Sequence, residues 1–350
     1  MSFRAPRSSG RSSLTHRAAE RPPTRRQGRA AALTLLGVLG LAFAGCGSSS
    51  SSSSPPPAAA SPSTVSRVTS TASHTTSSSA APAIPVVLPA AGVQGNVGWT
   101  PVVSIGGQTA AWLSRVPGEG EPITMLRFDQ GLTRLALHSG SMDPGGSGWQ
   151  YGDSIGPAEQ PKVVAGFQGG FKLLDDVGGF LSQGRLEHPL STGRASIVTY
   201  ISGQSDVGAW RSEVPAIGQA IFSVRQNLYP LIDHGQAASN VSSCVIACWG
   251  PTLGGGLASA RGALGIDSAG RLIYAGGERL TVSALAGSLV SAGVQRAAEL
   301  DINPEWVNLY LFRHEAGGSI GIIPMIPGQP GIPGQLLMPY NRDFFTVVVR

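Results

Sequence analysis

Residues 261–302 read RGALGIDSAGRLIYAGGERLTVSALAGSLVSAGVQRAAELDI, and this stretch decides the fold class that we expect. Two β-type runs, 263–266 and 272–275, flank a turn at 267–270. A helix is predicted next, with Thr281 or Ser283 as its cap and Gly293 as its stop. The apolar residues at helical spacing are Val282, Leu285, Leu289 and Val290. Residues 296–302 (RAAELDI) then form a strand. The order of hairpin, helix and strand predicts an α+β (mixed α/β) fold.

Short β-type runs also fill the rest of the region after residue 86. They are bounded by Gly, Pro or Asp and lie at 101–105, 124–128, 134–137, 162–167, 195–201 and 346–349. We therefore expect residues 86–350 to form one strand-rich domain with a mixed sheet and few helices.

The first 45 residues have the order of parts that a signal peptide has. Eight arginines precede or flank a hydrophobic run of sixteen residues, 30–45, and small residues lead into Cys46. A membrane-spanning helix needs about 20 apolar residues, so this run is too short to span. The end of the run, LAFAGC, resembles a bacterial lipobox, in which Cys46 is acylated. The alternative is an unmodified cysteine in an ordinary signal peptide.

Residues 46–85 are nearly all Ser, Pro, Ala and Thr. Such a segment buries too little apolar surface to offset its chain entropy, so we expect a disordered tether. With the lipobox, it predicts a protein held by a lipid on the outer face of the cell membrane. Beyond residue 45, 17 basic and 19 acidic side chains give a net charge of −2, which argues against a nucleic-acid partner.

Two further cysteines, Cys244 and Cys248, lie four residues apart beyond the export signal. They can form a disulfide only if the segment turns, because an extended strand would hold them too far apart. The alternative, a zinc site, needs more ligands than two cysteines, and no others lie at finger spacing. We expect the disulfide, and neither a metal nor a cofactor.

The segment 299–302 (ELDI) is the first candidate for chemistry. On a strand, Glu299 and Asp301 share one face while Leu300 and Ile302 share the other. Repulsion between two buried carboxyls separates their pKa values, as acid/base catalysis requires. The same pattern fits two solvated acids on an exposed strand equally well.

A second candidate is the turn in AGFQGGFK at 165–172. The glycines Gly169 and Gly170 allow backbone amides to approach a ligand closely, and Gln168 offers an amide. The alternative is a tight turn between strands. Arg261 is a third candidate, because its guanidinium can hold a phosphate.

Five segments in this order resemble the phosphodiester glycosidase domain family, the family of the lysosomal mannose 6-phosphate uncovering enzyme, and especially its actinobacterial exported members. They are GFQGGF (166–171), GRLEHPLSTGRAS (184–196), VRQNLYPLIDHG (224–235), RGALGIDSAGRLIYAGG (261–277) and AAELDINPEW (297–306). The resemblance covers over half of the domain and extends more loosely to RDFF at 342–345.

The resemblance implies site residues. The family's Asn-Gly-Gly-Phe turn falls on Gln168, Gly169, Gly170 and Phe171, its arginine falls on Arg261, and the acid of its Leu-Asp-Gly-Gly segment falls on Asp301. Two departures stand out. Gln168 is one methylene longer than Asn, and Ile302 and Asn303 replace Gly-Gly. Both narrow the space for a sugar phosphate, so either the substrate differs or activity is lost.

The enzymatic hypothesis is hydrolysis of a sugar-phosphate glycosidic bond in an extracellular or cell-wall glycoconjugate. Asp301 is the first choice for the catalytic carboxylate and Glu299 the second, while Arg261 neutralises the phosphate. His188 is a candidate for substrate binding. His234 fits a proton carrier or plain polar surface.

The competing hypothesis is a non-catalytic surface lipoprotein that binds a wall glycan or a partner protein. Trp249 and Trp306 fit sugar stacking or buried packing under either hypothesis. Geometry separates the two hypotheses, because catalysis requires Gln168, Arg261 and Asp301 to line one cleft.

Overall fold

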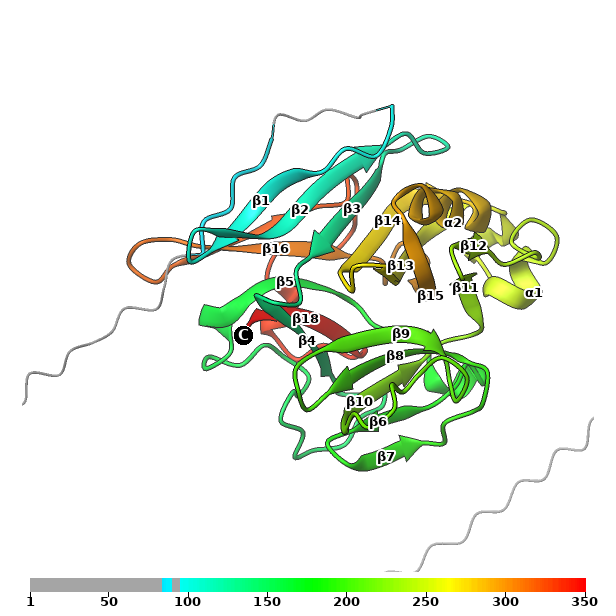
Figure 1. The fold of residues 1–350 in the computed structure, drawn as a ribbon, viewed down its shortest axis with the longest axis horizontal. Helices are drawn as coiled ribbons and strands as arrows, with labels where there is room; N and C mark the ends of the chain where they lie inside the picture. Colours follow the sequence, from blue (N-terminus) through cyan, green and yellow to red (C-terminus); the bar gives the residue numbers. More distant parts are fainter. Residues whose placement is uncertain (1–83, 90–94) are drawn as a thin grey trace, which may run out of the picture. The chain divides into compact units, whose positions relative to one another are not determined.

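The computed structural model describes residues 84–89 and 95–350 (Figure 1). The predicted signal peptide, the lipidated Cys46 and the tether up to residue 83 lie outside the described residues. The structure places Ile84, at the predicted end of the tether, in the hydrophobic core, where it is 2% exposed. In the described ranges, no helix has both the length and the apolar character needed to cross a membrane.

The strands form three sheets, and every pairing between them is antiparallel. The largest sheet has the order β1 (Thr100–Ile105), β2 (Gln108–Val116), β3 (Ile123–Phe128), β14 (Leu272–Leu280), β13 (Ser259–Asp267), β15 (Val294–Ile302), β11 (Pro230–Asp233) and β12 (Gln236–Ala237).

The other two sheets have five strands each. One has the order β7 (Arg185–His188), β6 (Phe180–Ser182), β10 (Ile221–Gln226), β8 (Ala195–Tyr200) and β9 (Ser205–Ala209). The other has the order β17 (Ile320–Pro324), β16 (Leu309–His314), β5 (Val163–Gln168), β18 (Phe344–Val349) and β4 (Thr133–His138).

Helices are few in the described ranges. The α-helices are α1 (Val245–Trp249) and α2 (Val282–Ser291), and single 3-10 turns are η1 (Gln160–Lys162), η2 (Leu173–Asp175), η3 (Leu253–Gly255) and η4 (Gln335–Leu337). The expected α+β class with a mixed sheet is therefore wrong, and the protein is mostly β with antiparallel sheets.

The error has a specific cause in the segment from β13 to β15. The hairpin, the helix and the following strand all lie where the sequence predicts them, and Thr281 caps α2 by accepting a hydrogen bond from the Ala284 amide at 3.2 Å. The sequence does not show that β13 lies between β14 and β15 and pairs with both of them. Because β13 runs antiparallel to each neighbour, the crossover through α2 creates no parallel pair.

Helix α2 packs on the large sheet through the residues that the helical spacing predicts. Val282, Leu285 and Leu289 are fully buried and belong to a hydrophobic cluster with side chains of β13, β14 and β15. Val290 is 37% exposed, so it lies at the edge of the buried face. A second and larger core joins the three sheets and includes Phe167, Leu300 and Phe345.

Candidate functional site

The turn after β5 is the centre of a buried polar network. The three amides of Gly169, Gly170 and Phe171 donate to Asp343 O at 3.0 Å, Asp343 Oδ2 at 3.1 Å and Asn227 Oδ1 at 3.0 Å. A methyl group at Gly169 would lie 2.1 Å from Asp343 Oδ2, so no side chain fits there. All three amides thus donate to acceptors of the protein itself.

The carbonyl groups of the same turn are also bonded. Gly169 O accepts from the Asp301 amide at 3.0 Å, and Gly170 O accepts from Arg342 Nη2 at 2.8 Å. Phe171 O accepts a short hydrogen bond from Arg225 Nη2. The turn therefore ties β5, β10, β15 and β18 together.

A fully buried ion pair supports this turn. Arg225 on β10 donates from Nε to Asp343 Oδ2 at 2.8 Å and from Nη2 to Oδ1 at 3.1 Å. Burial lowers the pKa of Arg225, but the charge and hydrogen bonds of Asp343 outweigh it and the pKa is raised. Because removing either partner would leave a buried charge uncompensated, the pair is a structural requirement of the turn.

Glu299 and Arg261 form a second fully buried pair. Arg261 Nη1 donates to Glu299 Oε1 at 2.7 Å and to the carbonyl of Trp249 at 3.1 Å. Within the part of the chain that the structure describes, Arg261 Nε and Nη2 and Glu299 Oε2 have no hydrogen-bond partner. Burial raises the pKa of Glu299 to about 7, and Arg261 offsets this only in part.

Asp301 and Arg342 form a third pair, which lies nearer the surface. Arg342 Nη2 is 2.8 Å from Asp301 Oδ2, and the two side chains are 6–7% exposed. The Arg342 guanidinium also lies 3.3 Å from Asp143 Oδ2 and 4.9 Å from the ring centre of Trp306, which is half-buried. Burial raises the pKa of Asp301 to about 7, although Arg342 lowers it.

A β-bulge modifies the expected alternation along β15. Glu299 is opposite Ala263 and Ile302 is opposite Arg261, so Leu300 and Asp301 together face Gly262. The structure accordingly places Leu300 in the large core, whereas Ile302 packs with Phe171. Simple strand alternation predicts that Leu300 and Ile302 share one packing environment, but the bulge places them in different ones.

Gln168 lies at the end of β5, between two sheets. Its Oε1 accepts from the Tyr274 hydroxyl at 3.0 Å and from the Asn308 amide at 3.2 Å, and the side chain is 2% exposed. A methyl group at Gly262 would lie 2.1 Å from Gln168 Nε2, so the glycine leaves room for the longer amide. Gln168, Arg261 and Asp301 thus belong to one buried region, but each side chain bonds to a different partner.

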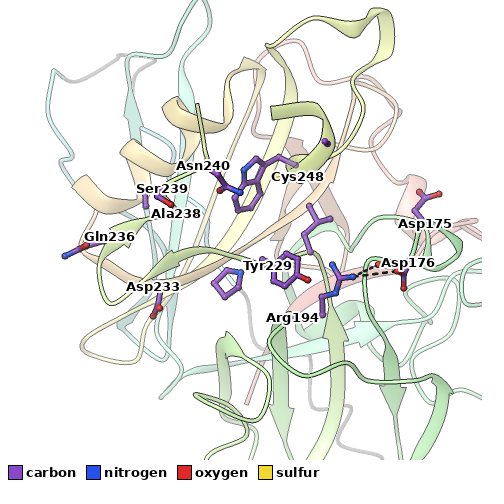
Figure 2. A pocket seen from close by; sticks show the side chains of 15 residues that line it. Asp175, Asp176, Arg194, Tyr229, Asp233, Gln236, Ala238, Ser239, Asn240 and Cys248 are labelled. Carbon is purple, nitrogen blue, oxygen red and sulfur yellow. Dashed lines mark hydrogen bonds and ion pairs between the residues drawn. The ribbon is translucent and has the colours of Figure 1, made fainter. Parts of the chain in front are cut away.

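A pocket of about 830 Å³ lies beside this region and is drawn in Figure 2. Its wall includes Asp176, Arg194, Tyr229, Asn240 and Trp249. Gln168, Arg261 and Asp301 do not line it, although Trp249 provides both pocket wall and the carbonyl that Arg261 binds.

Cys244 and Cys248 are joined by a disulfide whose Cα atoms lie 5.4 Å apart. The turn that the pairing needs is α1, which begins at Val245 directly after Cys244. Cys248 also lines the pocket, and Trp249 at the end of α1 is 1% exposed. The disulfide thus fixes the helical turn that positions Trp249.

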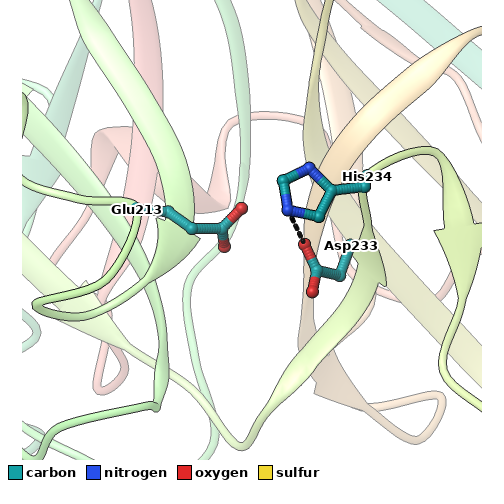
Figure 3. Close-up of side chains that lie close together, drawn as sticks. All are labelled: Glu213, Asp233 and His234. Carbon is teal, nitrogen blue, oxygen red and sulfur yellow. Dashed lines mark ion pairs between the residues drawn. The ribbon is translucent and has the colours of Figure 1, made fainter.

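The two histidines that the sequence offers as candidates, His188 and His234, lie outside the buried network. His188 ends β7 at the edge of its sheet, and His234 is 85% exposed in the turn after β11. Figure 3 shows His234 near Asp233 and Glu213, whose ligand atoms all lie within 4.8 Å of one another. This group has the donor types for one cation, but Arg296 Nε lies 4.0 Å from Glu213 and opposes a positive charge there.

The fold and site of the described residues define an antiparallel, mostly β protein with three buried arginine-carboxylate pairs around the turn after β5. No protein-family model and no curated protein matches the chain. Among solved structures, it is similar to the zebrafish N-acetylglucosamine-1-phosphodiester alpha-N-acetylglucosaminidase catalytic domain auto-inhibited by its pro-peptide. The identity is 16% and the TM-score 0.44, over 69% of this chain and 82% of that one.

The chain is also similar to a hypothetical protein from Synechocystis, with 13% identity and a TM-score of 0.38 over 72% of this chain and 64% of that one. Both likenesses are distant, and neither assigns a reaction to this chain.

Proposed function

We propose that this protein is a hydrolase that cleaves the glycosidic bond between a sugar and a phosphate in an extracellular or cell-wall glycoconjugate. The observation that carries the proposal is the pair of Asp301 and Arg342, a carboxyl group with a pKa of about 7 held 2.8 Å from a guanidinium. At neutral pH such a carboxyl is present in both protonation states, as a general acid requires. The motif resemblance points to the same carboxyl group.

The pair supplies what cleavage of this bond needs. Asp301 in its protonated form gives its proton to the bridging phosphate oxygen as the bond from that oxygen to sugar C1 breaks. Water adds to C1 and loses a proton, so the products are the free sugar and a phosphate monoester. In this proposal a phosphate oxygen binds the Arg342 guanidinium, whose Nη2 also donates to Gly170 O and lies 2.8 Å from Asp301 Oδ2.

Glu299 and Arg261 have a supporting role in this proposal. Both side chains are fully buried and bond to each other at 2.7 Å, so neither reaches solvent in this conformation. Glu299 lies two residues before Asp301, and the charge of Asp301 contributes to its raised pKa. Glu299 remains the second choice for the carboxyl that assists the reaction.

The location that we propose is the outer face of the cell membrane, with a lipid on Cys46. The motif LAFAGC and the disulfide of Cys244 and Cys248, which requires an oxidising compartment, support this. Expression with a Cys46→Ala substitution should release the protein from membranes into the soluble fraction. Equal membrane retention of parent and variant would refute the lipid anchor.

The reaction is tested with a hexose linked through C1 to 4-nitrophenyl phosphate. Cleavage at the sugar releases 4-nitrophenyl phosphate, which an added phosphatase converts to coloured 4-nitrophenolate. Colour that forms without the phosphatase reports cleavage at the other phosphate ester and contradicts the assignment. In 18O-water, the label should enter the sugar.

Two variants make the test specific. Asp301→Asn should lower the rate at least about a hundredfold, because general acid catalysis contributes 10²–10⁴-fold. Asp206→Asn is the matched control. The Asp206 side chain is 17% exposed and, like Asp301, lies 2.8 Å from an arginine, here Arg296. This variant should keep the parent rate.

The second candidate function is a non-catalytic protein that binds a wall glycan or a partner protein. It is favoured by the turn at Gly169, whose amides all donate to acceptors of the protein, and by the separate partners of Gln168, Arg261 and Asp301. Absence of turnover by the parent chain on sugar phosphodiesters would support this function instead.

A further inference from the structure

We propose that the 830 Å³ pocket of Figure 2 is a binding site for an uncharged saccharide, separate from the Asp301 site. It lies among η2, the β11–β12 hairpin and α1, and its size falls in the usual range of ligand pockets. Three features of its wall identify the ligand class: a fixed aromatic ring, an unpartnered indole N–H, and a negative charge balance.

Tyr229 provides the aromatic surface. Its side chain is 57% exposed in the pocket wall, and the Arg194 guanidinium lies 4.6 Å from the ring centre. Arg194 is itself held by a hydrogen bond to Asp176 O at 2.9 Å. A ring held in this way offers a flat apolar face and a polar hydroxyl tip, which suit the apolar face and the hydroxyls of a sugar.

Trp249 provides a hydrogen-bond donor that lacks an acceptor. The residue lines the pocket and is 1% exposed, and among the residues that the structure describes its Nε1 has no partner. Buried indole N–H groups are normally hydrogen-bonded, so this one calls for an acceptor from outside the chain. A sugar hydroxyl is such an acceptor, and in this proposal it reaches the buried N–H through a small shift of the Trp249 side chain toward the pocket.

The charges of the wall select against anions. Asp175, Asp176 and Asp233 contribute three carboxylates. Among the described residues of the wall, Arg194 is the single cationic side chain, and it is already engaged by Asp176. These carboxylates would repel an anionic ligand. A neutral ligand can form hydrogen bonds with the side-chain amides of Gln236 and Asn240.

The pocket is separated from the Asp301 site by an apolar cluster. Phe171, Val177 and Ile302 are buried together, and Leu228 packs against them while it also lines the pocket. Binding in the pocket therefore does not depend on the reaction proposed for Asp301, and each proposal fails or holds by itself.

The test uses calorimetry and tryptophan fluorescence on the full chain with three neutral trisaccharides, maltotriose, cellotriose and chitotriose, and with anionic trigalacturonate. We expect at least one neutral trisaccharide to bind and to change the fluorescence, and trigalacturonate to bind at least tenfold more weakly. No binding of any neutral trisaccharide, or tighter binding of trigalacturonate, would overturn the proposal.

Four variants locate the binding. Tyr229→Ala should weaken it at least tenfold, and Trp249→Phe should weaken it and abolish the fluorescence change. Leu186→Ala, which changes a comparably exposed side chain on β7 outside the pocket, should bind like the parent. Asp301→Asn should also bind like the parent. Parent-like binding by Tyr229→Ala would rule out this pocket as the site.

Discussion

Arg342 Nη2 lies 2.8 Å from Asp301 Oδ2, and this contact joins the segment just before β18 to the end of β15. The same nitrogen donates to Gly170 O at 2.8 Å, so one guanidinium connects the candidate carboxylate with the turn after β5. Arg342 is therefore both an electrostatic partner of Asp301 and part of the framework that holds it.

Replacing Arg342 tests both roles. In Arg342→Gln the cation that lowers the pKa of Asp301 is gone, so this pKa should rise above about 7. At pH 8, where Asp301 is ionised in the parent, the free energy of unfolding should fall by about 3 kcal/mol. Carboxyl-carbon NMR titration and chemical denaturation measure the two effects.

Arg313→Gln is the control for this variant. Arg313 forms an ion pair with Glu315 in which both side chains are about half exposed, so its loss should change stability by less than about 1 kcal/mol. An unchanged titration midpoint of Asp301 in Arg342→Gln would contradict the electrostatic role.

The raised pKa values of Glu299 and Asp301 predict how stability depends on pH. Each carboxyl binds its proton more tightly in the folded chain than in the unfolded one, because burial disfavours the charged form. Their stabilising contribution is complete below about pH 4 and is lost as the pH rises through about 7. The variant with Glu299→Gln and Asp301→Asn should lose less stability over this range than the parent.

Denaturation at constant ionic strength between about pH 5 and pH 8 checks this slope. Leu186→Ala, which changes no titratable group, should keep the slope of the parent. An equal slope in the parent and in the doubly substituted chain would show that the two carboxyls do not titrate as expected.

Two glycines should respond to alanine in opposite directions. Gly169→Ala would place its methyl group 2.1 Å from Asp343 Oδ2 and should cost about 3 kcal/mol of stability. Gly287 lies on the exposed side of α2 with no atom near its Cβ position, and Gly287→Ala should stabilise by up to about 1 kcal/mol. Thermal unfolding of both variants measures these stability changes. Parent-like stability of Gly169→Ala would refute the close packing of the turn.

Gln168→Asn introduces the asparagine that the phosphodiester glycosidase domain family has in its Asn-Gly-Gly-Phe turn, but it should destabilise this chain. The shorter side chain cannot reach both Tyr274 OH and the Asn308 amide, and a buried donor without an acceptor costs about 1–3 kcal/mol. Gln219→Asn, at an exposed position, should leave the unfolding free energy within about 0.5 kcal/mol of the parent value. Equal stability of Gln168→Asn and the parent would mean that this bond pair is dispensable.

Sequence patterns located the local elements well. The helix of residues 282–291, its cap at Thr281 and the hairpin before it depend on contacts between near neighbours, so their signals lie within a few residues. The turn required for a disulfide between Cys244 and Cys248 is local for the same reason. Which strands pair, by contrast, is set by contacts between distant segments, and this is why the fold class was mispredicted.

The sequence by itself predicted a strand that carries Glu299 and Asp301, a glycine turn directly after Gln168 and a strand hairpin that begins at Arg261. Only the tertiary structure decided their partners. Asp301 meets Arg342, Gln168 meets Tyr274 and the Asn308 amide, and Arg261 meets Glu299 and the carbonyl of Trp249. The physical reason is that a buried charge must be compensated by whatever group the fold brings beside it, and spacing along the chain does not encode that neighbour.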